Sequence, residues 1–325
     1  MVRFKDYIER CIGRSIRSFG GVSGVSMDNV VKNIIMIPFN ILYKINPKME
    51  LKLLFRLKKK RNLNLENPKT YSEKLQWIKL YDKNPLMPKC VDKYLVRNYV
   101  KNKGCIELLN ELYWSGFNPE EIPFDDLPNK YVIKVTHGST FNIIVNDSTK
   151  IDKKLIIKKL KKWLKSKFLP CYGEWFYGKE KPRIIIEKYL ENPDVDQLFD
   201  YKVYCFNGVP KFVRFDVDRF SHHKCNLYDV NWQLIEGVTF KYPNINKKFK
   251  KPENFEKMLD YAKKLSQDFK HVRVDFYNIE GKIIFGELTF TSGAGFDEIS
   301  PLQFDEKLGD YLRLDNNDEN NFINS

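Results

Sequence analysis

The feature that most constrains this fold is a stretch near the C-terminus in which charged residues alternate with apolar ones. HVRVDFYNIEGKIIFGELTF, at residues 271–290, predicts two strands joined by a tight turn. Successive side chains of a strand point to opposite faces, so Arg273 and Asp275 are expected to point together, as are Glu287 and Thr289 on the partner strand. A cation and two carboxylates would then meet on one face of a sheet.

Two interpretations of this hairpin are open. Clustered carboxylates repel one another and need a cation, and oxygen ligands on a rigid sheet suit Mg²⁺ that also binds phosphate. The alternative is an exposed, salt-bridged hairpin of little energetic worth. The magnesium-binding interpretation is favoured because the residues that flank the carboxylates are apolar. The small loop at 291–295 would also let backbone N–H groups approach an anion.

The rest of the pattern predicts a mixed α+β chain without repeats, and 42% hydrophobic residues are enough for a globular core. A capped helix is expected at about 72–82, and further helices at 90–102, 152–168 and 252–269. Hairpins are expected in 130–147 and 200–217, and a single strand in 182–190.

The positive charge is concentrated in the N-terminal part. Residues 1–62 carry 14 Lys and Arg against 4 Asp and Glu, in a chain whose net charge is +14. We expect a basic helical arm that either packs on the main domain or lies on an anionic membrane surface or a polyanionic substrate. A nucleic-acid partner is not expected, since no helix-turn-helix, finger or RNP pattern accompanies the charge.

The sequence favours a cytoplasmic location, with peripheral contact at the inner face of the plasma membrane as an option. The six cysteines lack CxxC spacing, which indicates reduced thiols. The first residues lack the apolar core of a secretory signal, and the longest apolar run, at 34–42, is too short to span a bilayer.

A second candidate cluster follows the strand that contains Lys134. The next residues, His137, Gly138 and Ser139, form a small loop that could cover phosphates beside the ammonium group. A lysine followed by such a loop is weak evidence on its own.

The order of these motifs resembles the ATP-grasp superfamily, specifically its TupA-like branch of bacterial surface-polysaccharide loci. The resemblance covers about residues 63–312 and implies an ATP-grasp fold, in which two α+β subdomains clamp ATP. Four motifs carry it, namely Val91-Asp92-Lys93, Val132-Ile133-Lys134 with Gly138-Ser139, Ile186-Glu187-Lys188-Tyr189-Leu190, and Arg273-Val274-Asp275-Phe276 with Gly286-Glu287-Leu288-Thr289.

With this resemblance the chain divides into five parts. They are a basic helical arm (1–62), a helical region (63–130), a lid subdomain (131–192), a C-terminal subdomain with the magnesium site (193–314) and a disordered tail (315–325).

The resemblance implies ATP and Mg²⁺ as cofactors and assigns them residue by residue. Phosphate contacts would come from Lys93 or Arg97, Lys134, Lys202 and the loop of His137, Gly138 and Ser139. Adenine contacts would come from Glu187 and the backbones of Lys188 and Leu190, and the ribose contact from Asp200.

The metal ligands implied by the resemblance are Asp275, Glu287 and Thr289. Thr289 stands where the superfamily usually has Asn, and a hydroxyl is a weaker ligand, so a second magnesium is in doubt. Arg273 would stabilise charge that develops during transfer, and Lys134 is the other catalytic candidate.

The activity implied is an ATP-dependent ligation through an acyl phosphate. The amine of an amino acid would join a uronic-acid carboxylate of a surface polysaccharide or of its nucleotide- or lipid-linked precursor. Arg214, Arg219, Ser292 and Gly293 are the substrate candidates, although the arginines could simply pair with neighbouring aspartates. A glycan or sugar kinase, a glycosyltransferase and a non-catalytic polyanion-binding protein are the alternatives.

Overall fold

The structure is a computed structural model that describes residues 35–138, 140–192, 198–217 and 222–314. Several expectations lie outside the described residues: Ser139, Arg219, the first 34 residues of the arm and the tail at 315–325.

Eight helices and eleven strands are described in these ranges. The helices are α3 (Ile37–Ile45), α4 (Pro47–Lys59), α5 (Tyr71–Tyr81), α6 (Met87–Val91), α7 (Val96–Asn102), α8 (Lys153–Leu164), α9 (Phe255–Ser266) and α10 (Leu302–Tyr311). The strands are β1 (Leu112–Gly116), β2 (Tyr131–Val135), β3 (Asn142–Val145), β4 (Ile184–Lys188), β5 (Asp200–Phe206), β6 (Val209–Val217), β7 (Lys224–Asp229), β8 (Thr239–Phe240), β9 (His271–Ile279), β10 (Lys282–Thr289) and β11 (Ile299–Ser300).

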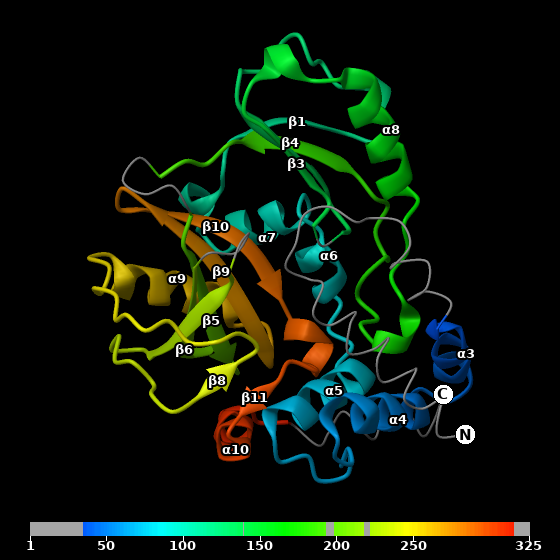
Figure 1. The fold of residues 1–325 in the computed structure, drawn as a ribbon, viewed down its shortest axis with the longest axis vertical. Helices are drawn as coiled ribbons and strands as arrows, with labels where there is room; N and C mark the ends of the chain where they lie inside the picture. Colours follow the sequence, from blue (N-terminus) through cyan, green and yellow to red (C-terminus); the bar gives the residue numbers. More distant parts are fainter. Residues whose placement is uncertain (1–34, 139, 193–197, 218–221, 315–325) are drawn as a thin grey trace.

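Two antiparallel sheets organise the chain. The larger sheet has the strand order β10-β9-β5-β6-β7, and the smaller one the order β1-β4-β2-β3. The smaller sheet lies with α8 at one end of the molecule, the larger sheet lies below it, and α6 and α7 come between them (Figure 1). The predicted α+β class is confirmed.

The smaller sheet shows why its strands alternate in sequence. Tyr131, Ile133 and Val135 of β2 are buried in one cluster with apolar residues of α8, including Leu160. The residue between them, Lys134, therefore points to the opposite face. The predicted hairpin is confirmed, but β1, expected to precede this subdomain, is the edge strand of its sheet and pairs with β4.

The two faces of the larger sheet are covered by different helices. On one face, α9 packs on β5, and Cys205 Sγ lies 3.8 Å from the carbonyl oxygen of Ala262. On the other face, aromatic residues pack against α5 and α10, with Tyr71 5.7 Å from Phe206 between ring centroids. This second face becomes charged toward the other end of the strands, where the candidate site lies.

Local signals explain the helix ends. Thr70 caps α5 by accepting from the Glu73 N–H while Glu73 accepts from the Thr70 N–H, which completes the predicted capping box. The expectation of one helix over 90–102 is wrong, because the Asp92 carboxylate accepts from the N–H groups of Tyr94 and Leu95, each at 2.9 Å. These hydrogen bonds hold a turn in place of the continuing helix, and α7 begins only at Val96.

The described part of the basic arm is helical and packs on the domain through one face. Leu51, Leu54 and Phe55 of α4 are fully buried. The spacing that could have indicated a membrane-facing stripe here serves ordinary core packing. Among the described residues, no helix has the length and apolarity needed to cross a bilayer.

His271 of β9 connects the larger sheet to α5. Its ring is fully buried, with Nε2 3.1 Å from the Tyr71 hydroxyl and Nδ1 2.7 Å from the carbonyl oxygen of Phe290. Burial lowers the pKa of His271 to about 4. The unfolded chain therefore takes up a proton below pH 6.5 that the folded chain refuses, and acidification favours unfolding.

We expect the stabilising effect of neutral His271 to be lost as the pH falls from 6.5 to 4. Urea unfolding of the wild type and of His271→Gln across this range measures it, and the difference in unfolding free energy should shrink by about 3 kcal/mol. The variant is needed because burial raises the pKa of Glu50 to about 8, an effect of opposite sign. A pH-independent difference would contradict the prediction.

Candidate active site

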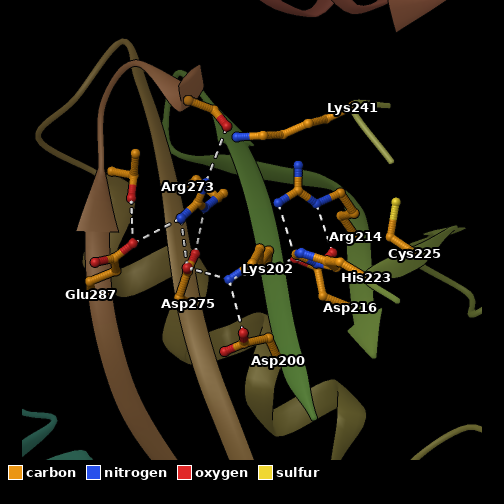
Figure 2. A network of polar contacts seen from close by, with 12 residues as sticks. Asp200, Lys202, Arg214, Asp216, His223, Cys225, Lys241, Arg273, Asp275 and Glu287 are labelled. Atoms are coloured by element: carbon orange, nitrogen blue, oxygen red, sulfur yellow. Dashed lines mark hydrogen bonds and ion pairs between the residues drawn. The ribbon is translucent and has the colours of Figure 1, made fainter. Parts of the chain in front are cut away.

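The larger sheet places four charged side chains in one row across its strands. Arg214 of β6 is opposite Lys202 of β5, Lys202 is opposite Asp275 of β9, and Asp275 is opposite Glu287 of β10. Residues paired across strands share a face, so two cations and two carboxylates stand side by side (Figure 2). The predicted convergence of Arg273, Asp275 and Glu287 is confirmed.

A β-bulge at Gly286 makes this row possible. Phe285 pairs with Phe276, but Glu287 pairs with the very next residue, Asp275, so Gly286 is an extra residue in β10. If Gly286 were instead paired regularly with Asp275, Glu287 would be opposite Val274 and would turn to the α9 face. A side chain at Gly286 would bring its Cβ to 3.0 Å from the Asp275 carbonyl oxygen, so the close approach favours glycine.

Arg273 ties the carboxylates together. Its Nε and Nη2 donate to the two oxygens of Asp275 at 2.6 and 2.7 Å, and Nη2 also donates to Glu287 at 2.9 Å. Thr289 Oγ1 donates to the same oxygen of Glu287 at 3.1 Å. Burial alone would raise the pKa of Asp275, but Arg273 and Lys202 hold it below its usual value. Asp275 is therefore charged at neutral pH.

Lys202 lies among three carboxylates. Its Nζ is 2.8 Å from Asp275, 3.3 Å from Asp200 and 4.0 Å from Asp216. Asp216 in turn accepts from Nε and Nη2 of Arg214 at 2.8 and 3.1 Å. Asp200 and Lys202 lie on the same face of β5, while a ribose contact by the buried Asp200 and a phosphate contact by Lys202 stay predictions.

The smaller sheet presents a second group of charges. Lys134 Nζ donates to Glu187 at 2.7 Å, and Arg97 Nη1 donates to the other oxygen of Glu187 at 3.1 Å. Lys93 Nζ donates to the carbonyl oxygen of Gly138 at 2.6 Å, which ties the loop after β2 to the segment after α6. Three cations from separate elements therefore gather around one carboxylate and one loop.

Lys93 also brings the two groups within electrostatic reach of each other. Burial lowers its pKa, and the carboxylate of Glu287 on the larger sheet is the main influence that opposes this effect. Lys134 and Glu187 on the smaller sheet act on the same ammonium group. Side chains from both sheets thus share one electrostatic environment around Lys93.

The loop after β2 is shaped by packing as well as by contacts. A Cβ at Gly138 would lie 1.9 Å from the Phe141 ring, so only glycine fits. The imidazole of His137 is buried and its Nε2 lies 2.9 Å from the carbonyl oxygen of Ser166. The side chain of His137 is thus engaged within the lid, and closure of its loop over phosphates stays a prediction.

The predicted adenine contacts are only partly available as the structure stands. The Lys188 N–H donates to the Glu111 carbonyl oxygen at 3.0 Å, and the Lys188 carbonyl accepts from the Asn110 side chain at 2.8 Å. Glu187 is engaged by Lys134 and Arg97, as described above. The adenine role of Glu187, Lys188 and Leu190 stays a prediction.

The small loop after β10 is held from several directions. Ser292 Oγ accepts from Arg273 at 3.1 Å and donates to Asp297 at 3.0 Å, so its hydroxyl supports the site rather than facing solvent. Asp297 pairs with Lys241 at 3.2 Å. Gly293 is exposed and adopts φ +54°, a conformation that suits glycine.

Sequence reasoning missed the residues that anchor this loop. Lys79 of α5 is fully buried and donates to the carbonyl oxygens of Tyr172 and Ala294 at 2.7 and 2.8 Å. Gln76, one turn earlier, donates to Gly295 at 3.0 Å. Burial lowers the pKa of Lys79. Their i, i+3 spacing on a predicted helix is visible in the sequence, but nothing in the sequence indicates that this face is buried.

The carboxylate pair fits a magnesium ion that is shared with phosphate. Within the described ranges no group of three or more His, Cys, Asp or Glu is arranged to hold a metal. Mg²⁺ commonly takes one or two protein carboxylates and completes its shell with phosphate oxygens and water. Glu287 suits this use, because its side chain is 50% exposed and both of its described contacts fall on Oε1. Thr289 reaches the same oxygen.

We expect the replacement of Lys202 by methionine to destabilise the fold by about 3–5 kcal/mol, because it leaves buried carboxylates without their cation. Lys248→Met, which breaks an exposed pair with Glu236, should cost less than about 1 kcal/mol. Chemical denaturation of both variants tests this expectation. Equal losses would show that Lys202 does not balance the row.

Comparisons with known proteins give a family match and several similar solved structures. A family model described as TupA-like ATPgrasp matches residues 73–313. No curated protein matches the sequence. Solved structures similar to this chain include D-alanine–D-alanine ligase from Bacillus anthracis, with 18% identity over 62% of this chain and 57% of that chain at a TM-score of 0.38.

Two further solved structures have similar values. L-amino acid ligase from Bacillus licheniformis has 14% identity over 64% of this chain and 42% of that chain, at a TM-score of 0.36. Phosphoribosylamine–glycine ligase from Thermotoga maritima has 12% identity over 63% of this chain and 49% of that chain, at a TM-score of 0.38. The chain thus spans less than two thirds of the length of these proteins.

The family assignment rests on the family model, which covers well over half of the 325 residues and includes all four sequence motifs and both groups of charges. The chain belongs to the TupA-like ATP-grasp family.

Proposed function

We propose that this protein is an ATP-dependent carboxylate–amine ligase that joins the amine of an amino acid to a uronic-acid carboxylate of a surface polysaccharide or its precursor. The observation that carries this proposal is the pairing of Asp275 and Glu287 on one sheet with a cation group on the other, within electrostatic reach of Lys93. A triphosphate with bound magnesium is the ligand class that needs both carboxylates for the metal and cations for the phosphates.

The cation group would bind the phosphates. Lys134, Arg97 and Lys93 now neutralise Glu187 and hold the loop at Gly138. Phosphate oxygens can replace these acceptors without leaving any ammonium or guanidinium group unpaired. The magnesium held by the carboxylate pair would neutralise phosphate charge and align the terminal phosphate.

Arg273 would stabilise the negative charge that develops in the reaction. Its guanidinium is buried, and the neighbouring carboxylates keep its pKa well above the usual value against the effect of burial. It therefore remains a cation throughout. A fixed cation in a water-excluded site stabilises developing charge without reorganising during the reaction.

Two transfers complete the proposed reaction. A carboxylate oxygen of the acceptor attacks the terminal phosphorus of ATP, and ADP leaves. The nitrogen of the amine then attacks the carbonyl carbon of the acyl phosphate, inorganic phosphate leaves, and the proton of the amine passes to solvent. These steps need positioning and charge neutralisation rather than a protein nucleophile.

Arg214 and Lys241 support an acidic acceptor. Two nitrogens of Arg214 bind Asp216, but Nη1 is buried without a hydrogen-bond partner among the residues that the structure describes. Lys241 lies close enough for the charge of Arg214 to oppose the rise in the Lys241 pKa that Asp297 causes (Figure 2). A buried N–H left without an acceptor is costly, so a substrate carboxylate would be a favourable partner.

A cytoplasmic location, where ATP and activated sugar precursors occur together, forms part of this proposal.

The direct test is product analysis with Mg-ATP, a uronate-bearing glycan and a panel of amino acids. ADP and phosphate should appear only when both the glycan and an amine are present, and the glycan should gain the mass of an amino acid minus water.

Glu287→Gln should lower the rate at least about 100-fold. Glu280→Gln, in the turn of the same hairpin, should not. AMP and pyrophosphate would overturn the mechanism, and a phosphorylated glycan without an amine would indicate a kinase.

Arg214→Lys tests the acceptor site. Lysine keeps the charge but loses the fork that binds Asp216 and a second carboxylate together, so KM for the acidic acceptor should rise about tenfold. KM for ATP should stay unchanged, as should both constants in the control Arg313→Lys, an exposed position. Equal increases in both KM values for Arg214→Lys would place Arg214 outside the acceptor site.

A further inference from the structure

Large apolar side chains are exposed at regular spacing on the two N-terminal helices. Ile37, Ile41 and Ile45 of α3 are 50%, 54% and 76% exposed, and Met49 and Leu53 of α4 are 58% and 41% exposed. A four-residue interval places side chains on the same side of a helix. These five account for almost half of the large hydrophobic residues that are exposed in the described part of the chain.

These outward residues are not needed to complete the hydrophobic core beneath the two helices. Each helix already buries its inner face, with Phe39 of α3 at 8% exposure and Leu51 and Leu54 of α4 at 0%. The apolar row on the opposite side of these helices belongs to no core cluster of the described residues. It therefore indicates a surface that meets something outside the domain.

A basic row adjoins the apolar one. Lys44, Lys48, Lys52 and Arg56 are exposed, also at four-residue intervals, and the three lysines each directly precede one of the outward apolar residues. Lys52 has a partner in Glu66, but at 3.8 Å and with the glutamate 90% exposed the pair is weak. The acid within α3 and α4, Glu50, is fully buried and does not offset the charge of this surface.

We propose that the outer face of α3 and α4 binds an anionic lipid bilayer. Isoleucine side chains would enter the boundary between headgroups and acyl chains, and the adjoining lysines would contact lipid phosphates. An amphipathic helix with this distribution lies in the plane of the interface, and each cation near an anionic leaflet adds to the binding. The inference does not depend on the proposed reaction.

The positive charge of this face argues against two other occupants, which are the N-terminal segment of the same chain and a second copy of the protein. Residues 1–34 carry six Lys and Arg against three Asp and Glu, so this segment has the same sign as the face. A second copy of the chain would bring an identical basic row into contact with the first. An anionic bilayer supplies both an apolar layer and the opposite charge.

The position of α4 gives membrane binding a consequence for the site. Lys59 at the end of α4 donates to the carbonyl oxygen of Asp297 at 2.7 Å, and Asp297 pairs with Lys241. The helix that would lie on the bilayer is thus directly bonded to the loop beside the candidate acceptor site. A lipid-linked acceptor would meet this side of the domain.

The test is co-sedimentation of the full-length protein with vesicles. Vesicles of phosphatidylcholine with phosphatidylglycerol should bind at least about tenfold more protein than phosphatidylcholine alone, and high salt should weaken the binding. The double variants Ile41→Ser/Ile45→Ser and Lys48→Gln/Lys52→Gln should each reduce binding about tenfold. Circular dichroism and thermal unfolding verify that these variants are folded.

Matched controls come from α8, the other strongly basic helix. Lys154→Gln/Lys158→Gln removes the same charge from exposed positions, and Leu155→Ser removes an apolar residue that is 61% exposed. These variants should bind vesicles as the wild type does. Equal binding to neutral and anionic vesicles, or loss of binding in the α8 variants alone, would overturn the proposal. A dimer in light scattering that dissociates on Ile41→Ser/Ile45→Ser would assign the face to a second copy and overturn it too.

Discussion

The candidate site depends on the electrostatic balance of one row across the larger sheet. Arg214, Lys202, Asp275 and Glu287 come from four adjacent strands, and the first three are almost completely buried. Charges at such depth persist only if opposite charges are fixed beside them. The sheet register provides this arrangement, since cross-strand partners lie within contact distance irrespective of the conformation of the loops. The geometry of the acids is therefore set by backbone pairing, which is the most rigid part of the fold.

The same strands serve two purposes along their length. At one end of β5 and β9, the face that carries the row is aromatic and packs against α5, with Tyr71, Phe206 and His271 in contact. A few residues further along, the same face bears the charges of the row. The packed end holds the strands in register, so the charged end needs no support from loops for its alignment. Stability and chemistry are thus separated along a strand rather than between domains.

Much of this arrangement can be predicted from the sequence. The turns at Asn207-Gly208 and Glu280-Gly281, all four at positive φ, fix both hairpins of the larger sheet, and alternation then assigns the faces. Harder to predict are features that depend on tertiary contacts. The break at Asp92 needs its side chain to accept from the N–H groups of the turn that follows, and Lys79 is buried among carbonyl groups that are distant in sequence.

The extra residue in β10 has a consequence for how the hairpin can change over time. Deletion of Gly286 would leave Glu287 directly after Phe285 and opposite Asp275, so the pairing and both faces would persist without a bulge. Regular pairing of Gly286 with Asp275 would instead put Glu287 opposite Val274, and the acid would enter the hydrophobic layer. A lineage that preserves this chemistry could therefore lose the residue at 286, but it could not pair that residue regularly.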